Sequence, residues 1–188
     1  MYCNYLEASD YFLAFPSTYN PKTPNLPIVV GFRKQSLWNL GLPYVWERLS
    51  GDIDSLGGLI TDTMVNYLEL SLHTDEFHLE EHDRPRFVTR VKKHLHYTAA
   101  DQFTGITFGG QREQSIAVIY NKSLEIRGSK DLWFEDIWQA NDWDGSRDVW
   151  NIEFRFNRNR LTQKGIRTVG QLFSSINDLW KYCVEVSL

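Results

Sequence analysis

Two adjacent glycines, Gly109 and Gly110, separate two short segments whose residues favour β-strands. The first segment is Gly105–Phe108 and the second is Ser115–Tyr120. Glycine adopts positive φ angles without a steric cost, and tight hairpin turns require such angles. The sequence therefore predicts a β-hairpin at this point, so antiparallel strands must be part of any fold that the chain adopts.

Two further segments, Met64–His73 and Val149–Arg158, alternate between apolar and polar residues. In the first, the apolar residues are Leu68, Leu70 and Leu72, and in the second they are Ile152, Phe154 and Phe156. An alternation with a period of two predicts a strand with one buried face. The opposite faces of these two strands then carry Glu69 and His73 in the first, and Glu153 and Arg155 in the second.

Helical spacing of apolar residues occurs in three places. Asp83 can cap a helix whose apolar positions are Phe87, Val88, Val91 and Leu95. A short helix is predicted over Lys130–Gln139, with Leu132, Trp133, Ile137 and Trp138 facing inward. Thr168 and Gln171 form a capping box for a last helix, whose buried stripe is Val169, Leu172, Phe173, Ile176, Leu179, Trp180 and Cys183.

Residues 1–60 contain most of the prolines and give weaker signals, namely an edge strand at Ile28–Phe32 and a brief helix at Pro43–Leu49. The predicted fold class is α+β, with an antiparallel central sheet of about five strands, helices packed on one face and an open polar face. At 188 residues the chain is predicted to form a single domain, 1–188, in which residues 1–60 are an irregular amino-terminal part. The apolar carboxyl end suggests that a further region follows.

The net charge of −4 argues against a histone-like protein that binds nucleic acid by charge alone, but it permits a local basic surface. The candidates for contacts with a nucleic-acid backbone are Arg84, Arg86, Arg90, Lys92, Lys93, Arg112, Arg155 and Arg158. The simpler alternative is that these side chains form an ordinary charged surface that is exposed to water and binds nothing. The two cysteines are far apart in sequence, and there is no apolar span or signal peptide, which predicts a cytoplasmic protein with free thiols and no membrane partner.

Tyr120, Lys122 and Glu125 place a phenol, an ammonium and a carboxylate within six residues. Such a group can attack a phosphodiester, steady its charge and help to hold a metal. If the neighbouring strands are the ones identified above, Glu69, Glu153 and Glu125 converge on Mn²⁺ or Mg²⁺, ions that prefer oxygen ligands, and His73 adds a nitrogen. The alternative for Tyr120 is an ordinary core tyrosine whose hydroxyl is hydrogen-bonded.

These segments together resemble the rolling-circle replication initiators of plasmids and phages, a transesterase group related to the His-hydrophobic-His endonucleases. The resemblance covers roughly residues 60–188. Its motifs are Val65–His73, Phe103–Gly110, Ile119–Glu125, Val149–Arg155 and Leu179–Tyr182. It implies that Tyr120 is the nucleophile that stays on the 5′ phosphate, and that Glu69, Glu125 and Glu153 are metal ligands or their close supports.

The chain departs from the family's pattern at three positions. Asn121 replaces an aspartate, Asn151 replaces an arginine and His73 replaces a frequent second aspartate of the first strand. These changes would weaken the handling of metal and phosphate. A second pattern, His94-Leu95-His96 followed by Tyr97, fits the motif of the related endonucleases, but the helix predicted for this segment would point the two imidazoles apart.

Two functions follow from these observations. The first is a metal-dependent DNA nickase and strand transferase that acts on single-stranded or hairpin origin DNA, as a monomer or homodimer and with a host helicase as partner. The second is a module on the same scaffold that binds single-stranded nucleic acid without catalysis. A regulatory or structural protein that binds no nucleic acid is a third possibility, which the net charge allows.

Overall fold

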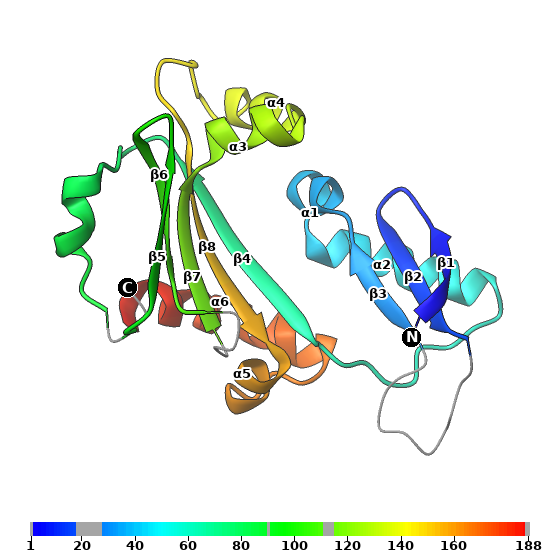
Figure 1. Cartoon of the computed structure of the whole chain (residues 1–188). Helices are drawn as coiled ribbons and strands as arrows, with labels where there is room; N and C mark the ends of the chain where they lie inside the picture. Colours follow the sequence, from blue (N-terminus) through cyan, green and yellow to red (C-terminus); the bar gives the residue numbers. More distant parts are fainter. Residues whose placement is uncertain (1, 18–27, 90, 111–114, 187–188) are drawn as a thin grey trace. The chain divides into compact units, whose positions relative to one another are not determined.

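The computed structural model describes residues 2–17, 28–89, 91–110 and 115–186. The chain divides into two compact units, Met1–Met64 and Val65–Leu188, whereas the sequence suggested one domain with an irregular beginning. Figure 1 shows both units, each of which has its own sheet. Among the described residues, no helix has both the length and the apolar character needed to cross a membrane.

The first unit is built from three antiparallel strands and two helices. The strands lie in the order β1 (Tyr2–Glu7), β2 (Tyr11–Pro16), β3 (Val29–Phe32), and the helices are α1 (Lys34–Leu40) and α2 (Leu42–Ser55). Its core contains the buried side chains of Tyr11, Leu13 and Leu49. The predicted edge strand is confirmed, but the predicted brief helix is twice as long, because it continues through Gly51.

The second unit contains the antiparallel sheet of five strands that the sequence predicted, with an α+β architecture (Figure 1). Its strands are β4 (Tyr67–Thr74), β5 (His94–Ala99), β6 (Gln102–Phe108), β7 (Ser115–Asn121) and β8 (Trp150–Asn157). Their order across the sheet is β4, β8, β7, β6, β5. The two alternating segments are therefore neighbours, and the hairpin strands β6 and β7 lie beside them.

One face of this sheet is the hydrophobic core. Phe154 and Phe156 of β8 and Ile106 of β6 are almost completely buried there. The last helix, α6 (Val169–Val186), covers this face, and the ring of its Trp180 lies 6.1 Å from that of Phe154. The stripe predicted for this helix is confirmed by the burial of Leu172, Leu179 and Cys183.

Three short helices follow the strands at the ends of the sheet. They are α3 (Lys122–Ser129), α4 (Trp133–Gln139) and α5 (Arg158–Gln163). The sequence predicted α4 with an earlier start and missed α3 and α5, which begin directly where β7 and β8 end. In α4 the buried residues are Phe134 and Trp138, whereas Leu132, predicted to face inward, is half exposed.

The helix predicted from Asp83 to Leu95 is wrong. The chain forms a 3₁₀ helix, η1 (Glu81–Arg86), has no regular structure at 87–89 and 91–93, and then forms β5. Pro85 lies inside η1 and prevents an α-helix from continuing through it. The β-branched residues Val88 and Val91 disfavour a helix, and β5 gains a hydrogen-bonded partner by pairing with β6.

Candidate active site

The register of the sheet brings Tyr120 beside two other polar residues on the face opposite the core. Tyr120 on β7 lies directly opposite Asn151 on β8, and Asn151 lies directly opposite His73 on β4. Paired residues of antiparallel strands project from the same face, with their Cβ atoms about 5 Å apart. The predicted nucleophile therefore lies next to the strand that carries Glu153.

Glu69 and Glu153 meet at the guanidinium group of Arg155. Arg155 is paired with Glu69 across the strands, and its Nε lies 3.4 Å from a carboxylate oxygen of Glu69. The same Nε forms a short ion pair with Glu153, which is only 6% exposed. The two predicted metal ligands therefore do approach one point, and a cationic side chain of the protein lies there.

Asn151 supports this pair of carboxylates. Its side-chain amide donates a hydrogen bond of 3.1 Å to Glu153. Its other polar atom, Oδ1, is buried without a hydrogen-bond partner. An amide oxygen beside the carboxylate of Glu153 is an oxygen donor of the kind that Mg²⁺ and Mn²⁺ accept.

The hydroxyl of Tyr120 is held in its protonated state. Burial and the nearby charge of Glu153 raise the pKa of Tyr120 to about 12, although a hydrogen bond from Asn151 acts in the opposite direction. At neutral pH the side chain is therefore a phenol. A positive charge placed between Tyr120 and Glu153 would offset the negative charge of Glu153 and so lower the pKa of Tyr120.

Lys122 and Glu125 lie at the start of α3, immediately after Tyr120. Lys122 is buried, and its Nζ lies 2.6 Å from a carboxylate oxygen of Glu125. The same Nζ lies 4.5 Å from the ring centroid of Phe134 and 5.6 Å from that of Tyr120. Lys122 is thus beside Tyr120, whereas Glu125 is paired with Lys122 rather than with the other two glutamates.

Asn121 begins α3 by capping it. Its side-chain oxygen accepts a hydrogen bond from the backbone N–H of Leu124, and its amide donates one of 2.7 Å to Asp148. A side chain that both accepts and donates suits this position. An aspartate here would keep the cap but would place a second carboxylate against Asp148.

His73 is enclosed by α4. The indole N–H of Trp138 donates a 3.0 Å hydrogen bond to its Nδ1, and the edge of the ring packs on Phe134. Burial, followed by the charge of Lys122, lowers the pKa of His73 to about 3. The imidazole is therefore neutral, as ligation requires, but one of its nitrogens already accepts a hydrogen bond.

The candidate DNA-binding residues do not form one group. Arg84 and Arg86 belong to η1 and pair with Glu81 and Asp83, respectively. Lys92 and Lys93 are exposed just before β5, and Arg158 is exposed at the start of α5. Arg155 is committed to the two glutamates, while Arg90 and Arg112 lie outside the described residues.

The His94-Leu95-His96 pattern lies in strand β5, so its two imidazoles do share a face. That face is the core side, because His94 pairs with Phe108 and His96 pairs with Ile106. The intervening Leu95 and the following Tyr97 face the side of Tyr120. In the part of the chain that the structure describes, no three His, Cys, Asp or Glu residues gather as a metal site, around these histidines or elsewhere.

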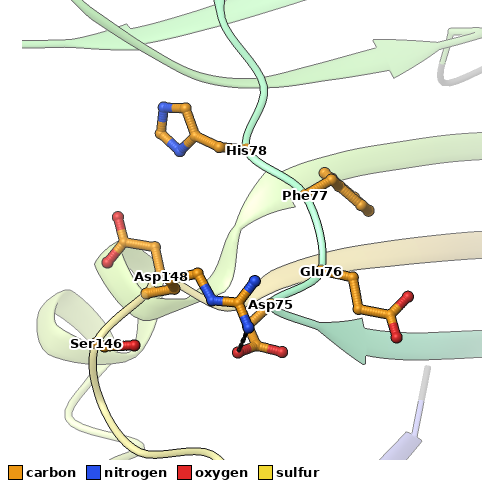
Figure 2. A pocket seen from close by; sticks show the side chains of 7 residues that line it. Asp75, Glu76, Phe77, His78, Ser146 and Asp148 are labelled. Atoms are coloured by element: carbon orange, nitrogen blue, oxygen red, sulfur yellow. Dashed lines mark ion pairs between the residues drawn. The ribbon is translucent and has the colours of Figure 1, made fainter.

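An open pocket of about 480 Å³ lies where β4 ends and β8 begins, and no sequence pattern predicted it. Figure 2 shows Asp75 and Glu76 directly after β4, with Ser146 and Asp148 on the segment that leads into β8. Asp75 forms an ion pair of 3.1 Å with Arg147. Because Asp148 accepts the hydrogen bond from Asn121, this pocket lies at the same end of the sheet as Tyr120.

The chain was compared with models of known protein families and with characterised proteins. No family model matches it, and no characterised protein matches its sequence.

Proposed function

We propose that this protein is a rolling-circle replication initiator, which nicks single-stranded or hairpin origin DNA through Tyr120 and rejoins it. The observation that carries the proposal is the arrangement on one sheet face: Tyr120 beside Asn151, and Asn151 bonded to the buried Glu153. The resemblance of the five motifs to plasmid and phage initiators supports it independently of this geometry.

The proposed reaction conserves the energy of the phosphodiester bond. The Tyr120 oxygen attacks phosphorus, the bond to the 3′ oxygen breaks, and the 5′ phosphate stays on the tyrosine. The phenol proton passes to Glu153, the carboxylate whose charge acts most strongly on Tyr120, and the 3′ oxygen leaves and takes up a proton from water. Lys122, beside the Tyr120 ring, offsets the charge of the phosphate, and attack by a 3′ hydroxyl reverses the reaction.

The residues on this face fit a hard divalent ion. They supply two carboxylates and the buried, unpartnered oxygen of Asn151, and Mg²⁺ commonly takes one or two protein carboxylates together with substrate phosphate oxygens. Glu69 and Glu153 would hold Mn²⁺ or Mg²⁺, whereas Glu125 is paired with Lys122 and His73 accepts the hydrogen bond of Trp138. When bound, the ion would polarise the phosphate and offset the charge that develops in the transition state.

The decisive experiment is to incubate the protein with Mn²⁺ and labelled origin-like hairpin DNA, and to look for a covalent adduct in a denaturing gel. Tyr120→Phe removes one oxygen and should abolish the adduct while the gel-shift affinity changes by less than about twofold. Tyr97→Phe is the matched control. If the adduct persists in Tyr120→Phe and disappears in Tyr97→Phe, the nucleophile is Tyr97 and the proposal is wrong.

A second function, binding of single-stranded nucleic acid without catalysis, is favoured by one observation. Arg155 contacts both glutamates, so a cation of the protein itself already lies between the two carboxylates. Absence of an adduct with any origin-like DNA, together with retained binding, would select this function. In either case we propose that the protein is cytoplasmic and acts as a monomer or homodimer. If it is a nickase, we propose that a host helicase is its partner.

A further inference from the structure

A row of directly paired residues crosses the whole sheet through the candidate nucleophile. From one edge to the other its members are Tyr97, Gly105, Tyr120, Asn151 and His73. Because paired residues share a face, Tyr97 on the edge strand β5 projects from the same face as Tyr120. The two tyrosines are two strand spacings apart, about 10 Å.

Tyr97 is exposed and its ring is held in place. The side chain is 45% exposed, and its hydroxyl lies 3.2 Å from the hydroxyl of the buried Thr107. Leu95, its neighbour on the same face, is 44% exposed. An aromatic ring that is accessible but fixed in orientation can hold an unpaired base by stacking without losing much side-chain entropy.

Gly105 keeps the surface between the two tyrosines low. A Cβ atom at this position would lie 2.7 Å from the backbone oxygen of Ile119 and 2.8 Å from Cβ of Tyr120, so the close approach of β6 and β7 excludes a side chain. The row therefore has a tyrosine on either side of a position without a side chain. Gly105 is itself buried, whereas Tyr97 is 45% exposed, so a flat group can reach the Tyr97 ring from its solvent side.

The segment that leads into β5 has the charge that a nucleic-acid backbone requires. Residues 84–100 contain five arginines and lysines, of which Arg84 and Arg86 pair with Glu81 and Asp83. Lys92 and Lys93 are exposed at its end, immediately before the strand that carries Tyr97. Stacking rings next to lysines are the combination that proteins use for single strands.

We propose that Tyr97 is a base-stacking residue for single-stranded DNA. The base of a nucleotide next to the scissile phosphate lies on the exposed side of the Tyr97 ring, and the backbone continues toward Lys92 and Lys93. The strand must be unpaired here, because stacking on a side chain needs an open base face. This inference rests on the proposed function only in placing DNA on this face, and it does not require that Tyr120 reacts.

The test uses the full chain and a fluorescein-labelled oligothymidylate, with affinity measured by fluorescence anisotropy. Tyr97→Ala should weaken binding about tenfold or more, whereas Tyr97→Phe, which keeps the ring, should stay within about twofold of the wild type. Tyr44→Ala is the matched control, since Tyr44 is 49% exposed but belongs to the first unit. Circular dichroism of each variant establishes that it is folded.

Salt dependence separates stacking from charge. The Tyr97→Ala defect should be the same at low and high salt, whereas Lys92→Gln should reduce the slope of log affinity against log salt by about 0.7. Replacing thymine by 5-iodouracil should in addition give a photo-crosslink to Tyr97, detected by mass spectrometry.

Three results would overturn the inference: unchanged affinity of Tyr97→Ala, a defect that disappears at high salt, or a change of sedimentation without a change of affinity. The last result would show that the edge strand β5 pairs with a second copy of the chain. A wild-type adduct with normal Tyr97→Ala binding refutes only the stacking inference. Weak Tyr97→Ala binding with no adduct from the wild type refutes only the nicking.

Discussion

Replacing Arg155 by methionine tests whether the two glutamates form a cation site. Methionine keeps much of the length and apolar surface of the arginine but removes the charge that contacts both carboxylates. Glu153 would then be a buried carboxylate whose remaining described partner is the amide of Asn151. We expect this variant to be less stable than the wild type and to bind Mn²⁺ more tightly.

The size of the stability loss follows from burial. Removing one partner of a fully buried pair costs about 3–5 kcal/mol, and an exposed pair contributes about 0–1 kcal/mol. Here the Glu153 side chain is 7% exposed and that of Arg155 is 38% exposed, so water screens one partner and not the other. An intermediate loss of about 2 kcal/mol is expected, which lowers the melting temperature of a unit of this size by roughly 8 °C.

Mn²⁺ should reverse this loss. An ion that binds only the folded state, at a hundred times its Kd, stabilises by about 2.7 kcal/mol, which exceeds the expected cost. The assay is urea unfolding of the wild type and of Arg155→Met, each with and without Mn²⁺, together with calorimetric titration of the ion. Arg158→Met is the matched control, because Arg158 is exposed and lies outside the pair of glutamates.

Equal stabilisation of the wild type and Arg155→Met by Mn²⁺ would refute the reasoning, since it would mean that the arginine and the metal do not compete for one place. No loss of stability in Arg155→Met without metal would refute the premise that Glu153 depends on this cation. If Glu69→Ala/Glu153→Ala binds Mn²⁺ as tightly as the wild type, the ion binds elsewhere.

Two further predictions concern the surroundings of Tyr120. The unfolded chain takes up a proton at His73 near pH 6.5, whereas the folded protein does so only near pH 3, so stability should fall as the pH drops through this window, by about 2 kcal/mol at pH 5. Urea midpoints at pH 7 and pH 5 should therefore differ less in His73→Gln than in the wild type, and equal differences would contradict the prediction. Asn121→Asp should lose about 1–2 kcal/mol through repulsion by Asp148, and Asn121→Asp/Asp148→Asn should regain it, as measured by thermal unfolding. A double variant no more stable than Asn121→Asp would show that Asp148 is not the cause.

Four of the five strands of the central sheet could be predicted from the sequence because their signal is local. Alternation of leucines with polar residues in Met64–His73, and of Ile152, Phe154 and Phe156 with polar residues in β8, needs only the geometry of a single strand. The same alternation placed Glu69, His73 and Glu153 on the polar sides of their strands. The last helix was predictable for the same reason, from its capping box and apolar stripe.

Strand β5 shows where local signals fail. The segment before and within β5 has apolar residues at helical spacing, namely Phe87, Val88, Val91 and Leu95. In the structure, β5 instead forms backbone hydrogen bonds with the edge of β6 that β7 does not occupy. Pairing with a distant strand satisfies backbone hydrogen bonds that no local pattern in the sequence reveals. Tyr97, which the sequence predicted to lie in a helix, therefore lies in a strand and projects from the same face of the sheet as Tyr120.

The sequence by itself determined which residues alternate, and therefore which side of its own strand each side chain occupies. Only the tertiary structure decided which strands are neighbours and in what register, because hydrogen-bonded pairing joins residues that are far apart in the chain. That pairing placed Asn151 between Tyr120 and His73, and Arg155 between the two glutamates. The contact between Glu125 and Lys122 is local instead, since the backbone enters α3 directly after β7 and a helix brings residues three apart together.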